Sequence, residues 1–185
     1  MCLDEDADAC SKFQPVALNR STIDGSALDP PQPPHVQPSY YAALLIDTFI
    51  GRSGHAQLVE LSVPSPNVTG YAAFEDGLLR RAVFVNLEAW LQSSETAGER
   101  PTVHLDLLPT FSLGATNAEV DSYHSRKTQV RRLLIQHADD VSGLLWAGQS
   151  YETLNARPVG RAAVEQVDVR DGIDLRATEA VLISF

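Results

Sequence analysis

The hydrophobic pattern of the chain changes its period once, and this change constrains the fold more than any other feature. Over 38–51, apolar residues recur at three- and four-residue spacing, which is typical of an amphipathic helix. Pro38 stands where a helix can begin without losing a hydrogen bond, and Gly51 stands where a helix commonly ends. From Ala56 onward apolar and polar residues alternate, which is typical of half-buried strands. The sequence therefore predicts one helix followed by β structure.

Turn dipeptides divide the β-rich part into short strands. Asp76-Gly77 and Asp171-Gly172 both predict hairpins, because these residue types tolerate the positive φ angles that tight hairpin turns require. Eight or nine strands with turns at this spacing predict an all-β fold, an antiparallel β-sandwich. The polar stretch 113–127 is predicted to be a long surface loop. The strands are predicted over 57–63, 71–75, 78–87, 102–106, 129–136, 143–147, 163–169, 173–177 and 180–185.

The segment before the helix is predicted to be irregular. Its proline-rich stretch 28–34 fits neither a helix nor a central strand, because proline lacks a backbone donor and fixes φ. The predicted fold class is thus an antiparallel β-sandwich preceded by one α-helix and an irregular, proline-rich N-terminal segment. The helix has no partner nearby in sequence, so we expect it at the edge of the sandwich or against another domain.

Charge and composition exclude some functions. The net charge of −10 argues against nucleic acid and anionic membranes as partners, since both attract clustered Lys and Arg. No secretory leader is visible, and the longest apolar run, 42–46, is too short to span a bilayer. Two sequons, at Asn19 and Asn67, favour a secreted protein with these residues as glycosylation sites.

The two cysteines lie close together in the acidic N-terminal segment. Cys2 and Cys10 either pair with each other or with partners elsewhere, and we favour a small structural disulfide over a reactive thiol. No nearby histidine or second cysteine pair indicates a metal site.

The sequence contains no recognisable catalytic or cofactor motif. The five histidines are isolated from one another, and neither a nucleophile elbow nor a phosphate-binding loop is present. Most glutamates stand at predicted turns or at alternating strand positions, where a solvated carboxylate is the simplest interpretation. We therefore predict no catalytic, metal-binding or cofactor-binding residue.

One segment carries residues of the kind that bind sugars. Trp146, Gln149 and Tyr151 offer two aromatic rings and an amide within six residues. Such residues either line a carbohydrate-binding groove or fill a core or the seam between two domains, and we favour the second interpretation. Burial of Trp146 distinguishes them, because a platform for a sugar must expose its ring.

Several co-ordered motifs resemble the C-terminal part of fungal glycoside hydrolase family 79. They are the helix 40–51, the hairpin Tyr71–Asn86, the pair Val130–Leu133 and Trp146–Thr153, the turn Arg157–Gly160 and the closing strand Glu179–Phe185. The family consists of β-glucuronidases and related endoglucuronidases, built as a (β/α)8 barrel followed by a β-sandwich. The resemblance implies that residues 1–54 are the end of a barrel, with its last helix over 38–51, and that residues 55–185 are the sandwich.

The resemblance carries no catalytic residue over to this chain. The family uses two glutamates at the ends of barrel strands, of which the acid/base follows an asparagine, and this chain contains no Asn-Glu dipeptide. The resemblance therefore implies a non-catalytic domain fragment, inactive alone, that stabilises a catalytic barrel missing here. It also implies a secreted parent protein and β-glucuronide-containing glycans as partners. The alternative is a free-standing carbohydrate-binding or interaction module; a complete small glycosidase would need two carboxylates converging in a cleft.

Overall fold

The computed structural model describes residues 16–17, 35–112 and 127–185. The described part contains two α-helices, α2 (Pro38–Ile50) and α3 (Leu107–Ser112), and two 3-10 helices, η2 (Gln92–Ala97) and η3 (Val169–Asp171). Its strands are β1 (Val16–Ala17), β2 (His35–Val36), β3 (Gln57–Leu61), β4 (Val68–Glu75), β5 (Leu78–Asn86), β6 (Thr102–Leu105), β7 (Lys127–Leu134), β8 (Leu145–Trp146), β9 (Glu165–Asp168), β10 (Ile173–Arg176) and β11 (Ala180–Ser184).

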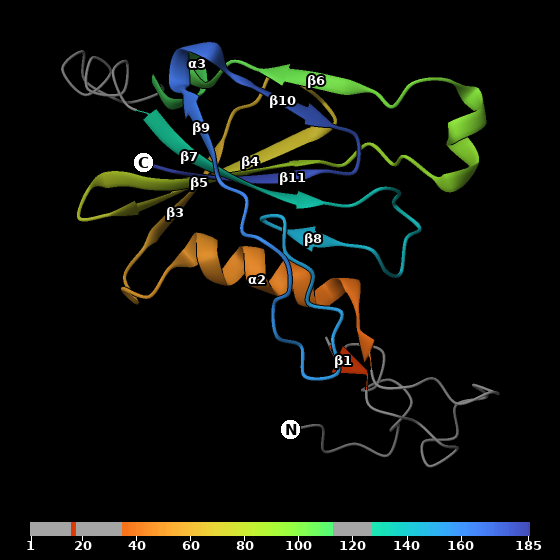
Figure 1. Cartoon of the computed structure of the whole chain (residues 1–185). Coiled ribbons are helices and arrows are strands. Elements are labelled where there is room, and N and C mark those ends of the chain that lie inside the picture. The colour runs from red at the N-terminus through yellow and green to blue at the C-terminus, as the bar shows by residue number, and fades with distance from the viewer. Residues whose placement is uncertain (1–15, 18–34, 113–126) are drawn as a thin grey trace, which may run out of the picture.

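An antiparallel sheet of seven strands organises the described part of the chain. Its order is β3-β4-β5-β11-β7-β8, and β9 pairs with β7 beside β8. Helix α2 lies along one face of this sheet, and the two-stranded sheet β6–β10 lies over the other face together with α3 (Figure 1). The predicted fold class, an antiparallel β-sandwich preceded by one helix, is confirmed.

The first predicted hairpin forms as expected. Strands β4 and β5 pair directly, and both turn residues between them have positive φ, 53° at Asp76 and 72° at Gly77. These angles match a two-residue turn whose twist follows that of the strands. The register shifts once, between Ala73 and Phe74, where a bulge increases the local twist.

The second predicted hairpin is wrong. Asp171-Gly172 does not join two paired strands, because β9 before it pairs with β7 while β10 after it pairs with β6. Gly172 ends the 3-10 helix η3 at φ 65°, and a Cβ added there would lie 2.6 Å from the Leu105 carbonyl oxygen. The dipeptide therefore lies where the chain passes from one sheet to the other. At Gly172 a positive φ and a close backbone approach both require glycine.

One element of the structure was not expected from the sequence, and one expected loop lies mostly outside the described residues. Helix α3 was not predicted, because its six residues contain Pro109 and carry no long periodic pattern. The loop predicted over 113–127 lies outside the described residues, except for Lys127, which begins β7.

The central strand β11 joins two hydrophobic cores. Its side chains alternate, so Val181 and Ile183 enter the core under β6, β10 and α3, whereas Ala180 and Leu182 enter the core under α2. All four residues are buried, which explains why β11 is a continuous apolar run instead of an alternating one. Helix α2 is thus packed on the sheet through the second core, and not through an isolated contact.

Gly70 on β4 leaves room for the Phe84 ring on the neighbouring strand. The two residues are direct cross-strand partners, and a Cβ at position 70 would lie 2.7 Å from the ring. We expect Gly70→Ala to destabilise the fold by about 1–3 kcal/mol through overpacking. Urea unfolding of Gly70→Ala and of Gly70→Ala/Phe84→Leu measures this, since the smaller side chain should restore part of the loss. Equal stability of Gly70→Ala and the unaltered chain would contradict the steric explanation.

Candidate functional site

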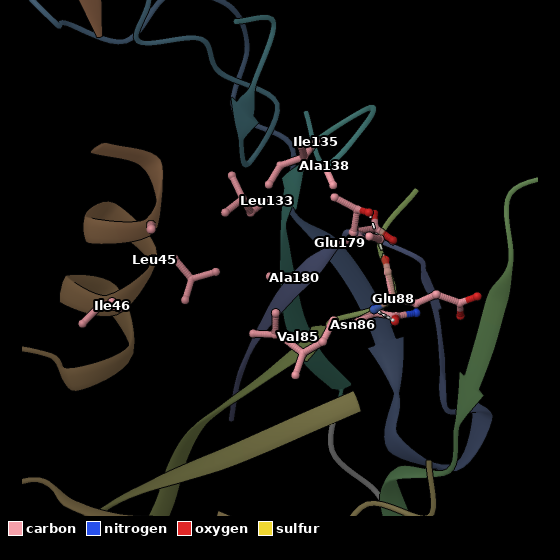
Figure 2. A pocket seen from close by; sticks show the side chains of 14 residues that line it. Leu45, Ile46, Val85, Asn86, Glu88, Leu133, Ile135, Ala138, Glu179 and Ala180 are labelled. Carbon is pink, nitrogen blue, oxygen red and sulfur yellow. Dashed lines mark hydrogen bonds between the residues drawn. The ribbon is translucent and has the colours of Figure 1, made fainter. Parts of the chain in front are cut away.

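An apolar groove of about 420 Å³ lies beside α2. Helix α2 forms one wall, and the end of β5, the end of β7 and the start of β11 form the rest (Figure 2). Leu45 extends from the helix toward Val85 and Leu133 of the sheet, as Figure 2 shows. The side chains that give the groove its apolar character are Ala42, Leu45, Ile46, Val85, Leu87, Ala89, Leu133, Ile135, Ala138 and Ala180.

Four polar side chains line one end of the groove, and each is engaged in contacts within the chain. The Thr178 hydroxyl donates to the Glu88 carbonyl oxygen (3.0 Å) and accepts from the Trp90 backbone N–H (2.8 Å). Asn86 is buried; its Nδ2 donates to the Leu175 carbonyl oxygen (3.4 Å) and its Oδ1 accepts from the Glu88 backbone N–H (3.0 Å). Glu179 is only 3% exposed, and its carboxylate accepts from the Arg176 backbone N–H at 2.9 Å. The Glu88 carboxylate accepts from the amide of Asn67 at 3.4 Å.

The buried Glu179 also belongs to an ion-pair network on β7. Arg132 lies 3.5 Å from the Glu179 carboxylate, and its guanidinium donates two hydrogen bonds to Glu165, at 2.8 and 3.3 Å. Burial of Arg132 acts to lower its pKa, but the hydrogen bonds to Glu165 and the charge of Glu179 outweigh this and hold the pKa above its ordinary value. The Glu179 carboxylate is therefore engaged within the chain by Arg132 and by the Arg176 backbone N–H.

The predicted sugar-contact residues lie at the junction between α2 and the loop after β8. Trp146 is 6% exposed and packs in the core under α2. The ring centroids of Tyr151 and Tyr41 lie 5.8 Å apart, and the backbone N–H of Tyr151 donates to the Tyr41 hydroxyl at 2.8 Å. Gln149 donates to the Gly160 carbonyl oxygen at 3.1 Å. The structure brings these three residues together within one chain, and their contact with a sugar or another domain stays a prediction.

Burial changes the acidity of Tyr151. Desolvation, assisted by the neighbouring Tyr40 and Tyr41, raises the pKa of its hydroxyl above the ordinary value. The hydroxyl is thus neutral across the physiological range, which fits a packing role for the ring.

Arg81 links the C-terminal end of α2 to the sheet. Its guanidinium donates to the carbonyl oxygens of Phe49 (2.7 Å) and Ile50 (3.2 Å), which end the helix, and it also pairs with Glu75. A cation at this position satisfies free carbonyls and complements the helix dipole. The hydrogen bond from Arg81 lowers the pKa of Glu75 below its ordinary value. With Tyr41 held at the start of α2 and Arg81 at its end, the helix is a fixed part of the sheet's surface.

The remaining predicted site residues fall into two groups. Asn67 is exposed, just before β4, and its glycosylation stays a prediction. Asn19, Cys2 and Cys10 lie outside the described residues. Among the residues that the structure does describe, no three His, Cys, Asp or Glu side chains are placed to hold a metal ion, and no helix is long and apolar enough to cross a membrane.

The groove itself was not predicted from the sequence. One sequence feature indicates it, because the side of α2 that faces away from the core is also largely apolar. Ala42, Ala43, Ile46 and Ile50 are all exposed, and Asp47 is the helix's single charged residue. An ordinary surface helix carries polar residues on that side.

Comparison with known proteins identifies the region. The family model described as the glycosyl hydrolase family 79 C-terminal beta domain matches residues 70–182, more than half of the chain. A β-glucuronidase of Neurospora crassa is 25% identical over 168 residues, which cover 80% of this chain and 28% of that protein. A β-glucuronidase of Aspergillus niger is 25% identical over 150 residues, covering 80% of this chain and 25% of that protein. The chain thus spans about a quarter of the length of these curated relatives.

A solved structure shares the fold. A 4-O-α-L-rhamnosyl-β-D-glucuronidase from Fusarium oxysporum, solved in complex with Rha-GlcA, superposes with a TM-score of 0.51 at 19% sequence identity. The match covers 69% of this chain and 26% of that one. At this identity the likeness establishes the fold only. The family-model match over residues 70–182 shows the family: this chain belongs to glycoside hydrolase family 79, of which it contains the C-terminal β domain.

Proposed function

We propose that the chain acts as the non-catalytic C-terminal β domain of a β-glucuronidase-like glycoside hydrolase, packing against a catalytic barrel and stabilising it. In this proposal β-glucuronide-containing glycans are hydrolysed in the barrel, and the chain alone is inactive. The match to a C-terminal domain and the quarter-length coverage of two β-glucuronidases support it. Secretion and glycosylation at Asn19 and Asn67 are part of the same proposal; the mass of the secreted protein before and after glycan removal tests them.

The observation that carries the proposal is that both carboxylates lining the groove make contacts within the chain. A retaining glycosidase needs two carboxyl groups about 5 Å apart that face the scissile bond, one to exchange a proton as acid/base and the other to attack as the nucleophile. Glu179 is instead buried against Arg132 and the Arg176 backbone, and Glu88 is bonded to Asn67. The engagement of Glu179 within the chain, together with the contact of Glu88 to Asn67, supports a non-catalytic role for the groove.

The test compares three purified proteins with an aryl β-glucuronide as substrate. They are the chain alone, the Neurospora crassa β-glucuronidase truncated before the region that this chain matches, and the truncated enzyme joined to the whole chain. We expect no turnover by the chain alone. We expect the chimera to hydrolyse the substrate and to unfold at a higher temperature than the truncated enzyme, because the added domain covers apolar surface of the barrel.

Three outcomes would reject the proposal. Turnover by the chain alone that disappears in Glu88→Gln or Glu179→Gln would place a glycosidase site in this chain. A chimera no more stable than the truncated enzyme would reject the stabilising role. Specific binding of the isolated chain to glucuronide glycans would favour a free-standing carbohydrate-binding module instead.

A further inference from the structure

One sequon of the chain lies on the described surface, at the start of β4. Asn67-Val68-Thr69 has the Asn-x-Thr pattern that an N-linked glycan requires, and its middle residue is not proline. Asn67 is exposed just before the strand, whereas Val68 is buried in the core. The sequon at Asn19 lies outside the described residues, so the structure describes the surroundings of Asn67 alone.

The strand register places the Asn67 side chain on the same side of the sheet as the groove. Val68 is the cross-strand partner of Asn86, so Asn67 stands opposite Leu87, whose backbone N–H donates to the Asn67 carbonyl oxygen at 2.7 Å. Residues opposite each other in an antiparallel pair point to the same face, with Cβ atoms about 4.5–5.5 Å apart. Because Leu87 lines the groove, Asn67 faces that side of the sheet as well.

The nitrogen atom that would carry a glycan faces the polar end of the groove. Nδ2 of Asn67 donates to the Glu88 carboxylate at 3.4 Å, and Glu88 lines that end of the groove, as Figure 2 shows. An N-linked glycan leaves one N–H on this nitrogen, so the hydrogen bond to Glu88 is compatible with the modification. Leu87, which precedes Glu88, is 65% exposed. The first sugar would therefore be attached directly beside an exposed leucine.

We propose that Asn67 carries an N-linked glycan whose first N-acetylglucosamine covers Leu87 at the polar end of the groove. The C–H face and the acetamido methyl group of this sugar are apolar, so they shield a leucine from water while the hydroxyl groups stay solvated. The donor is an oligosaccharide linked through pyrophosphate to a lipid. Nδ2 forms a bond to C1 of the sugar and loses one proton, the bond from C1 to the pyrophosphate breaks, and nothing is oxidised or reduced. This inference rests on the secretion included in the proposed function.

The first measurement asks whether Asn67 is modified. The full chain is placed behind a secretory leader and produced in a fungal host in four forms: unaltered, Asn67→Gln, Thr69→Ala and Thr69→Ser. Asn67→Gln and Thr69→Ala remove the sequon by different routes, whereas Thr69→Ser keeps it and is the matched control. Peptide mass mapping before and after glycan removal is expected to find a glycan at Asn67 in the unaltered chain and in Thr69→Ser, and none at this position in the other two forms.

The second measurement uses hydroxyl-radical footprinting to compare the exposure of Leu87 in the same four forms. We expect Leu87 to be oxidised at least about threefold more slowly in the two glycosylated forms than in the two without a glycan, because the sugar excludes water from its side chain. Leu154 is the internal control, since it is 91% exposed and does not line the groove, and it should react equally in all four forms. Trimming the glycan to its first N-acetylglucosamine should leave Leu87 protected.

The results separate failure of the inference from failure of the proposed function. A secreted chain with Asn67 unmodified would overturn the inference, and a glycosylated chain in which Leu87 reacts as fast as in Asn67→Gln would overturn the covering of Leu87. Slow oxidation of Leu87 in Thr69→Ala without a glycan would assign the protection to the Asn67 side chain and reject the role of the sugar. A chimera without added stability would reject the proposed stabilising role, whereas glycosylation at Asn67 and protection of Leu87 would still support the inference.

Discussion

Truncating Tyr41 to alanine is expected to lower the free energy of unfolding by about 3–5 kcal/mol, the range found for other fully buried aromatic residues. Tyr41 is fully buried between α2 and the loop after β8, with its ring edge-on to Tyr40 and Tyr151 at 6.4 and 5.8 Å. Its removal leaves a cavity at the start of the helix and also removes the acceptor for the Tyr151 backbone N–H. Since domains of this size are typically stable by about 5–15 kcal/mol, the loss is a large fraction of the total.

A second variant separates packing from hydrogen bonding at this position. Tyr41→Phe keeps the ring but leaves the Tyr151 N–H without its 2.8 Å acceptor, so we expect a loss of about 1–3 kcal/mol. Tyr71→Ala serves as the matched control, because Tyr71 is partly exposed on β4 and should lose less than about 1 kcal/mol. Urea unfolding followed by Trp fluorescence measures all three variants. A Tyr41→Ala loss no larger than that of Tyr71→Ala would mean that α2 is not anchored through this residue.

Replacing Arg132 by methionine should be nearly as damaging, for an electrostatic reason. The substitution leaves Glu179, which is 3% exposed, without the guanidinium 3.5 Å away. Breaking a buried ion pair on one side typically costs about 3–5 kcal/mol, and we expect the lower end because the charge of Arg100 also acts on Glu179. The loss also includes the Arg132 hydrogen bond to the Asp174 carbonyl oxygen at 2.9 Å, which links β7 to β10.

The double variant Arg132→Met/Glu179→Gln tests this explanation. Neutralising Glu179 removes the unpaired buried charge, so the double variant should be more stable than Arg132→Met alone. Arg131→Met is the control on the same strand, because its longer contacts, 3.4 Å to Ser184 and to Gln129, predict a change below about 1 kcal/mol. If the double variant is less stable than Arg132→Met, the role assigned to Glu179 is wrong.

Both predictions concern contacts that hold α2 and the groove beside it in place. Tyr41 holds the start of α2, and Arg132 neutralises the carboxylate at the polar end of the groove. A loss at either residue is therefore expected to lower the stability of the fold around the groove.

The sequence by itself determined the features that depend on neighbouring residues. The three- and four-residue spacing over 38–51 predicted α2, whose bounds are Pro38–Ile50, because a helix imposes its period on the residues that it buries. The Asp76-Gly77 turn was equally local: the positive φ angles of both residues set the β4–β5 hairpin without help from elsewhere. The family resemblance came from motifs of the same kind and is confirmed by the match over residues 70–182.

Only the tertiary structure decided which strands pair and what their side chains contact. Asp171-Gly172 has the same turn chemistry as Asp76-Gly77, yet it passes between sheets, because β9 and β10 find their partners about 40 and 70 residues earlier in the chain. The burial of Trp146 under α2 and the engagement of Glu179 by Arg132 also depend on contacts between distant segments. Such contacts leave no periodic signal in the sequence, which is why the groove beside α2 emerged only when the sheet was assembled.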